Sequence, residues 1–158
     1  MKKNEVRLRS TLRECDKHLK RAKYAGNQIA PLLPLEAQKI PKLTEDEIAY
    51  IDQMIYRYIK LQDAMGRKLL KAILLYLDED VENKAAIDMF NRSEQLGIIQ
   101  NYDSWKEMRE LRNELTHEYE EEDNDTAEKL NLLIDKLSEA EKYLNDIRTF
   151  LKNRKLIF

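Results

Sequence analysis

The run RNELTHEY at residues 112–119 combines side chains that are suited to acid–base chemistry on a phosphodiester. Arg112 carries a planar guanidinium that can hold phosphate oxygens and stabilise charge building up at phosphorus. His117 carries an imidazole that titrates near neutral pH, so it can accept a proton from a ribose 2′-hydroxyl or donate one to a leaving oxygen. The pair predicts phosphodiester cleavage by side chains alone, with no metal ion and no cofactor.

On a helix this run divides into three sectors when each residue advances by about 100°. An apolar sector holds Trp105, Met108, Leu111, Leu115 and Tyr119, and an acidic sector holds Glu107, Glu110, Glu114 and Glu118. The sector between them holds Arg109, Arg112, Asn113, Thr116 and His117. A structural helix needs only an apolar and a solvated face, so the third sector indicates a binding cleft. Tyr119 lies two turns after Arg112 on nearly the same line, where both can face one ligand.

Spacing alone leaves another interpretation open. His117 lies near Glu114 and Glu121 in the helical pattern, and a surface histidine paired with a glutamate is as good an explanation of that spacing as catalysis.

The rest of the chain predicts an all-α fold, an up-and-down bundle of about five helices in one domain over residues 1–158. The first helix is expected from Val6 to Ala25 and to end at Gly26, with Cys15 buried on its apolar stripe. A second, long helix follows a capping box of Thr44 and Glu47. A short helix is expected over residues 85–96. A fourth is capped by Asp103 or Ser104, and a fifth by Asp125 or Thr126.

Composition places the chain among cytoplasmic globular proteins. The single cysteine excludes an internal disulfide, and a reducing cytoplasm is the default expectation. No apolar stretch approaches the roughly 20 residues that span a bilayer, and the charged N-terminus predicts no signal peptide, so no membrane partner is expected. A net charge of −2 argues against coating nucleic acid by bulk electrostatics.

The basic residues are nevertheless concentrated at the two ends of the chain. One group runs from Lys2 to Lys23 and the other from Arg148 to Lys155. A charge run is usually a solvated face; the alternative is that both groups flank one surface that grips a phosphate backbone. His18, within the first group, is expected at the surface.

Further residues near the middle of the second helix have two interpretations. Gly66 costs up to about 1 kcal/mol in a helix interior relative to alanine. Close helix packing is the preferred explanation, and room for a ligand or a partner backbone is the alternative. Gln62, Asp63 and Gly66 can line the Arg112 cleft, but ordinary contacts between helices are the preferred interpretation.

RNELTHEY reads as R-x-x-x-x-H-x-Y, which resembles the signature of HEPN-domain proteins, and the trailing tyrosine resembles the HepT-like toxin branch. The stretches YRYIKLQDAMGRKLLKAILLYL and RSEQLGIIQNYDSWKEMRELRNELTHEYEEE resemble the second-helix and motif-helix regions of that family in the same order. With the last helix, the resemblance covers most of the chain.

The resemblance implies a helical bundle that pairs as a homodimer, so that two motif helices build one composite cleft. It implies a metal-independent endoribonuclease toxin in which Arg112 binds the scissile phosphate of RNA and His117 transfers protons. Asn113, Arg109 and Thr116 would support the cleft. It further implies a minimal nucleotidyltransferase antitoxin as cognate partner, which modifies Tyr119 with adenylate. The products would carry 2′,3′-cyclic phosphate and 5′-hydroxyl ends.

Two other functions are alternatives to the ribonuclease. The chain could be a non-catalytic partner that presents a nucleotide or peptide to a minimal nucleotidyltransferase, which the acidic stretch EYEEEDND and the long amphipathic helices suggest. A purely structural helical dimer is the third possibility, and the motif disfavours it.

Overall fold

The computed structural model describes residues 2–116 and 123–155, and all secondary structure in this part is helical. The α-helices are α1 (Lys2–Ile29), α2 (Glu45–Asp63), α3 (Leu70–Tyr76), α4 (Ala86–Gln95), α5 (Tyr102–Leu115) and α6 (Asp123–Asn153). A π-helical turn, η3 (Ala64–Leu69), joins α2 to α3. Two 3-10 turns, η1 (Ala30–Leu32) and η2 (Ala37–Lys42), lie before α2. The prediction of an all-α bundle is confirmed.

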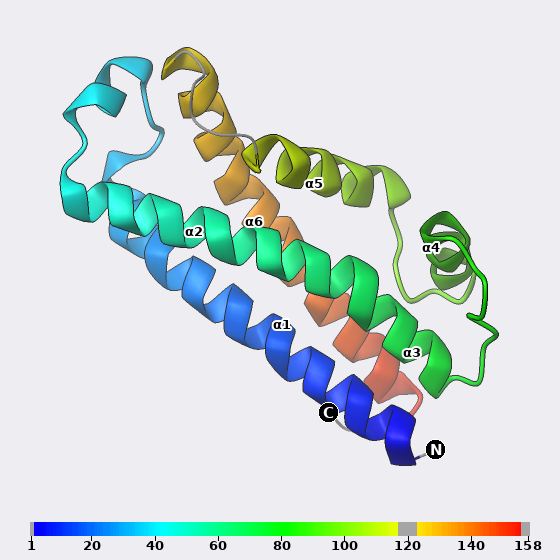
Figure 1. The fold of residues 1–158 in the computed structure, drawn as a ribbon. Coiled ribbons are helices and arrows are strands. Elements are labelled where there is room, and N and C mark those ends of the chain that lie inside the picture. Colours follow the sequence, from blue (N-terminus) through cyan, green and yellow to red (C-terminus); the bar gives the residue numbers. More distant parts are fainter. Residues whose placement is uncertain (1, 117–122, 156–158) are drawn as a thin grey trace.

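The long helices lie side by side; α2–η3–α3 and α6 run in the same direction, and α1 runs opposite to both (Figure 1). α1 and the continuous α2–η3–α3 segment are antiparallel, and α6 packs behind them. α5 packs against both α2 and α6. α4 lies beside α3. Counted with α2, η3 and α3 as one helix, the described chain has the five helices that the sequence predicted.

The core follows the periodic apolar positions of the sequence. On α1 the predicted stripe of Leu8, Leu12, Cys15, Leu19 and Ala22 is buried. On α6 the predicted stripe is buried too, at Leu130, Leu133, Leu137, Ala140, Leu144, Ile147 and Leu151. Burial raises the pKa of the Cys15 thiol to about 12, as expected for a thiol held in an apolar interior.

The predicted end of α1 at Gly26 is wrong, because the helix continues to Ile29. A Cβ at Gly26 would lie 3.6 Å from Met54 Sδ and 3.9 Å from Ile134 Cδ1, so α2 and α6 approach closely here. Ala25 and Ile29 are buried on either side. Their packing offsets the modest helix penalty of a glycine, and the helix ends instead where Pro31 enters η1.

The helix starts differ in how well local sequence predicted them. The capping box before α2 is confirmed: the Thr44 hydroxyl accepts from the Glu47 N–H at 3.2 Å, and Glu47 accepts from the Thr44 N–H at 2.8 Å. The α5 cap is Asn101, whose side chain accepts from the Ser104 N–H at 3.2 Å, not Asp103 or Ser104. α6 begins at Asp123, ahead of the predicted caps.

His18 is not the surface residue that the basic run suggested. Its side chain is 11% exposed and lies between α1 and α2. Its Nδ1 is 3.0 Å from Arg57 Nη1, and its Nε2 is 3.8 Å from a Glu14 carboxylate oxygen. Among the described helices, none is both long enough and apolar enough to cross a membrane.

Candidate functional site

Four residues of the polar sector predicted on the motif helix, Arg109, Arg112, Asn113 and Thr116, lie in the described part of the chain. Trp105, Met108 and Leu111 are buried against the bundle, because they share one side of the helix. Arg109, Asn113 and Thr116 are exposed, and Arg112 lies half-buried at the edge of the apolar side. A long arginine stem can be covered there while its guanidinium stays available.

Arg112 is held by a carboxylate from the neighbouring helix. Its Nε donates to Asp63 Oδ1 and its Nη2 to Asp63 Oδ2, both at 2.9 Å. The two side chains are 22% and 30% exposed. The hydrogen bonds from Arg112 to Asp63 raise the pKa of Arg112, against a smaller opposing effect of burial. This side-on geometry fixes the guanidinium and leaves the Nη1 edge free of Asp63, available to an anion.

A cavity of about 110 Å³ opens beside this ion pair. It is lined from three directions, by Gln62, Asp63, Gly66 and Arg67 of α2 and η3, by Ala86 and Phe90 of α4, and by Trp105, Arg109, Arg112 and Asn113 of α5. The preferred sequence interpretation, ordinary contacts between helices, holds for Asp63, which pairs with Arg112, and for Gly66, which lies against Trp105. The alternative interpretation, that Gln62, Asp63 and Gly66 line the Arg112 cleft, holds as well. All three share a cavity with the predicted Arg112 and Asn113.

One of the residues that line the cavity, Trp105, has a buried hydrogen-bond donor without a partner in the described part of the chain. Trp105 is 1% exposed, and its Nε1 has no hydrogen-bond partner among the described residues. Its ring packs against Phe90 at a centroid distance of 5.0 Å and against Tyr143 at 5.3 Å. A Cβ at Gly66 would lie 3.6 Å from Trp105 Cζ2, an ordinary contact distance, so η3 packs against the indole at this position.

The cavity thus offers a distinct set of chemical groups. The guanidinium groups of Arg67, Arg109 and Arg112 supply positive charge. Asp63 and the buried amide of Gln62 supply acceptors, and Phe90 with Trp105 supplies an aromatic wall whose two rings are tilted by 60° to each other. Such a set can bind an anionic group at its mouth and a planar group within.

Contacts below the cavity fix the position of α5. The buried Tyr58 hydroxyl donates to the Met108 carbonyl at 2.7 Å, linking α2 to α5. Lys136 of α6 donates to Glu107 at 2.7 Å, and Ser104 donates to Glu139 at 2.9 Å. α5 is therefore tied to both neighbouring helices one turn before Arg112.

Two predicted residues lie outside the described part of the chain. These are His117, predicted to transfer protons, and Tyr119, predicted as the modification site. Thr116, the third predicted supporting residue, is described; its hydroxyl donates to the Asn113 carbonyl at 2.7 Å, and it is not a lining residue of the cavity.

Sequence reasoning missed the contributions of Arg67, Ala86 and Phe90 to the cavity. For Arg67 a signal existed, since it follows Gly66 directly. For the α4 residues no local signal existed, because only the packing of α4 against α3 brings them to α5. Within residues 2–116 and 123–155, no group of three or more His, Cys, Asp or Glu side chains is placed to hold a metal ion.

No protein-family model matches the chain, and no curated protein or solved structure is significantly similar to it.

Proposed function

We propose that the protein is a metal-independent endoribonuclease that cleaves RNA through Arg112 and His117. The observation that carries the proposal is the fixed Arg112 guanidinium, held side-on by Asp63 at 2.9 Å, at the mouth of a cavity rich in cations and aromatic rings. The resemblance of RNELTHEY to the HEPN signature supports the same assignment.

In the proposed reaction the ribose 2′ oxygen bonds to phosphorus while the bond from phosphorus to the 5′ oxygen breaks. An imidazole accepts the 2′-hydroxyl proton, and a second imidazole donates a proton to the departing 5′ oxygen. Arg112 stabilises the additional negative charge on the phosphoryl oxygens. The products then carry a 2′,3′-cyclic phosphate and a 5′-hydroxyl, and no water is consumed in this step.

A second copy of the chain supplies the second imidazole in this proposal. Each chain has one histidine in the motif, and two proton transfers on opposite sides of phosphorus require two groups. Two α5 helices brought together in a homodimer would provide them. Light scattering at micromolar concentration is expected to give the mass of a dimer; a strict monomer would contradict the composite site.

Cleavage is tested with purified protein and cellular RNA in excess EDTA. Wild-type protein is expected to cut the RNA, and Arg112→Ala and His117→Ala are each expected to lower the rate by about 100-fold or more. Equal cleavage by all three proteins, or none by the wild type, would overturn the proposal. Lys142→Ala, at an exposed position on α6, is the matched control.

Regulation by a minimal nucleotidyltransferase belongs to the same proposal. The partner would act as an antitoxin that transfers the AMP group of ATP to the Tyr119 hydroxyl and releases pyrophosphate, which adds bulk and negative charge to the motif. Mass spectrometry of the coexpressed pair is expected to place the added mass on Tyr119. Unchanged neutralisation of a Tyr119→Phe variant would show that the antitoxin silences the protein by another route.

One observation favours the alternative function, a non-catalytic binding partner of such a transferase. Asp63 already neutralises the charge of Arg112, as it would in a purely structural pair. Overexpression in cells distinguishes the two functions. A ribonuclease is expected to arrest growth, and the His117→Ala variant is expected not to. A binding partner is expected to copurify with the transferase without arresting growth.

A further inference from the structure

A stripe of cations follows one side of α1. Arg13, Lys17, Lys20 and Arg21 fall, together with Tyr24, within an arc of about 100° around the helix. All five are exposed. Four of them are cations, and none forms an ion pair with another described residue. In a chain with a net charge of −2, this is a strong local excess of positive charge.

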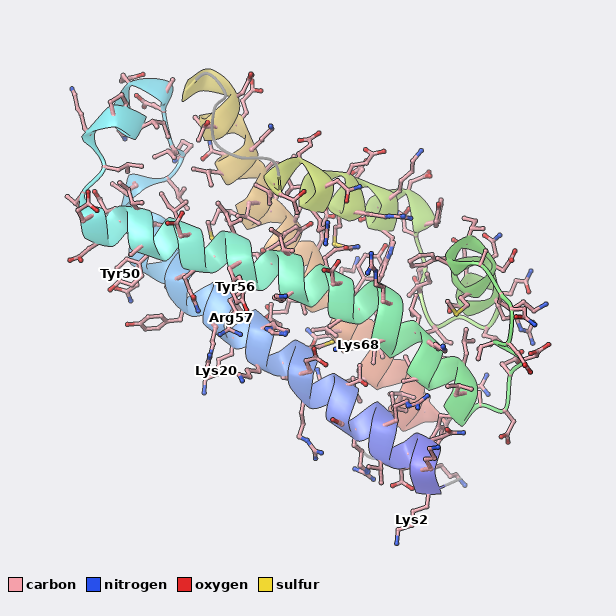
Figure 2. The ribbon with its side chains drawn as sticks, viewed as in Figure 1. Lys2, Lys20, Tyr50, Tyr56, Arg57 and Lys68 are labelled. Carbon is pink, nitrogen blue, oxygen red and sulfur yellow. The ribbon has the colours of Figure 1, made fainter. Side chains whose placement is uncertain are left out.

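Tyrosine rings from α1 and α2 adjoin this stripe. Tyr24 is 60% exposed, and its ring meets the edge of Tyr50 at a centroid distance of 6.3 Å, which orients it. Tyr56 is 51% exposed, with Arg57 Cζ 5.3 Å and Lys60 Nζ 5.6 Å from its ring centre. Figure 2 shows Lys20, Tyr50, Tyr56 and Arg57 gathered along the α1–α2 pair.

A groove lies between the cations of α1 and the neighbouring helix α2. It is lined by Lys17, Lys20, Arg21 and Tyr24 from α1 and by Gln53 from α2. We use the name cationic face for the surface made by Lys17, Lys20, Arg21, Tyr24, Tyr56 and Lys60. It carries cations and an exposed tyrosine ring on each of the two helices, with most of the cations on α1.

This combination fits single-stranded nucleic acid better than other polyanions. Lysine and arginine side chains hold successive phosphates, and exposed aromatic rings stack on bases, which every single strand offers. A duplex hides the faces of its bases within the helix, so it could use the cations but not the rings. An acidic peptide or an anionic lipid has no base to stack on the rings.

The cationic face is continuous with the Arg112 cavity along α2. Tyr56, Lys60, Asp63 and Arg67 follow one another at i, i+4, i+7 and i+11 and therefore share one side of the helix. Asp63 and Arg67 line the cavity. The helical rise puts Tyr56 about 10 Å from Asp63 along the axis, so one strand can contact both surfaces.

We propose that the cationic face binds a single-stranded segment of RNA next to the nucleotide held in the Arg112 cavity. Phosphates lie on Lys17, Lys20 and Arg21, and bases stack on Tyr24 and Tyr56. The choice of RNA as ligand rests on the proposed ribonuclease function, whereas the recognition of a single strand follows from the cations and rings themselves.

Binding is tested by fluorescence anisotropy with a labelled 2′-O-methyl oligonucleotide of about 12 nucleotides, a length within the range that single-strand binding surfaces cover. This probe has no free 2′-hydroxyl, so it cannot be cleaved by the proposed reaction. The variant Lys17→Ala/Lys20→Ala/Arg21→Ala is expected to weaken binding about tenfold or more. It is also expected to lower the salt dependence, since three lost phosphate contacts reduce the logarithmic slope by about 2.

The rings are tested separately. Tyr24→Ala/Tyr56→Ala is expected to weaken single-strand binding by about tenfold while leaving the salt dependence unchanged, because stacking releases no counterions. A blunt duplex of the same length is expected to bind more weakly than the single strand. All substituted positions are exposed, and circular dichroism checks that the helical fold is kept.

The matched control removes the same charge elsewhere, at the exposed positions Lys106, Lys142 and Lys152, each changed to alanine. The proposal would be overturned if this control weakened oligonucleotide binding as much as the triple variant of the cationic face, or if neither face variant changed binding. Equal binding of duplex and single strand, or binding only to phosphatidylserine vesicles, would overturn it as well. The result is independent of catalysis: failure of the wild-type protein to cut RNA overturns the ribonuclease proposal but leaves the binding measurement valid.

Discussion

Asp63 of α2 and Arg112 of α5 form a two-point ion pair, with Nε–Oδ1 and Nη2–Oδ2 distances of 2.9 Å. The residues are 49 positions apart in the chain. The pair sets the direction of the guanidinium and closes one side of the cavity that also contains Trp105 and Gly66. It is the contact through which α2 orients Arg112 of α5.

Replacing Asp63 by asparagine tests the positioning role of this pair. The amide keeps the size of the side chain but loses the charge, so Arg112 is expected to lose its fixed orientation. Cleavage of RNA is expected to fall about tenfold or more. The free energy of unfolding is expected to fall by only about 1 kcal/mol or less, because both side chains are partly exposed.

Urea unfolding and a cleavage assay on the same protein separate the two effects of Asp63→Asn. Asp135→Asn, at an exposed position on α6, is the control and is expected to change neither quantity. Full cleavage activity of Asp63→Asn would show that the pair has only a structural role.

Gly66→Ala is expected to raise stability and lower activity together. A Cβ here meets Trp105 Cζ2 at 3.6 Å and Gln62 Nε2 at 3.9 Å, which are ordinary contacts. Removing a glycine from a helix interior is therefore expected to stabilise the protein by up to about 1 kcal/mol. The added methyl group also takes space from a cavity of about 110 Å³, so RNA cleavage is expected to fall.

Thermal unfolding followed by circular dichroism measures the first effect of Gly66→Ala, and the RNA assay measures the second. Gly26→Ala is a useful comparison, since its Cβ would also meet ordinary contacts but lies away from the cavity. It is expected to change stability without affecting cleavage. Full RNA cleavage activity of Gly66→Ala would show that the cavity is not part of the cleavage site.

Tyr58→Phe is expected to lower the free energy of unfolding by about 1 kcal/mol. The buried hydroxyl donates to the Met108 carbonyl at 2.7 Å, and phenylalanine keeps the ring but removes that link between α2 and α5. Denaturant unfolding measures the change. Tyr24→Phe, where the residue is 60% exposed, is expected to have no measurable effect on stability. An equal loss in both variants would argue against the buried hydrogen bond as the cause.

Acidification is expected to destabilise the protein through His18. Burial, and then the neighbouring Arg57 guanidinium, lower the pKa of His18 below its usual 6.5. The unfolded chain then binds the proton more readily than the folded one. The contribution of neutral His18 to stability is therefore present above pH 6.5 and is lost as the pH falls through the lower pKa of the folded state.

Urea unfolding from about pH 7.5 to about pH 5 measures this contribution, in wild-type protein and in His18→Gln. Glutamine keeps an acceptor for Arg57 but does not titrate in this range. The wild type is expected to lose more stability than the variant on acidification. Equal pH dependence in the two proteins would show that His18 is not responsible.

The sequence alone determined those features that depend on neighbours within a few residues. The helical stripes of α1 and α6 and the capping box of Thr44 and Glu47 involve residues three or four positions apart, whose relation is fixed as soon as a helix forms. The same local geometry placed Arg109, Arg112 and Asn113 on one polar sector of α5. Gly26 shows the limit of such reasoning, because its packing against Met54 and Ile134 is not a local property.

Only the tertiary structure decided what the polar sector faces. Asp63 meets Arg112 because α5 lies along α2, where the Tyr58 hydroxyl also donates to the Met108 carbonyl. The aromatic wall likewise depends on α4 bringing Phe90 to within a centroid distance of 5.0 Å of Trp105. Local spacing orders residues around one helix, whereas the rotation and translation of one helix against another result from many side-chain contacts together.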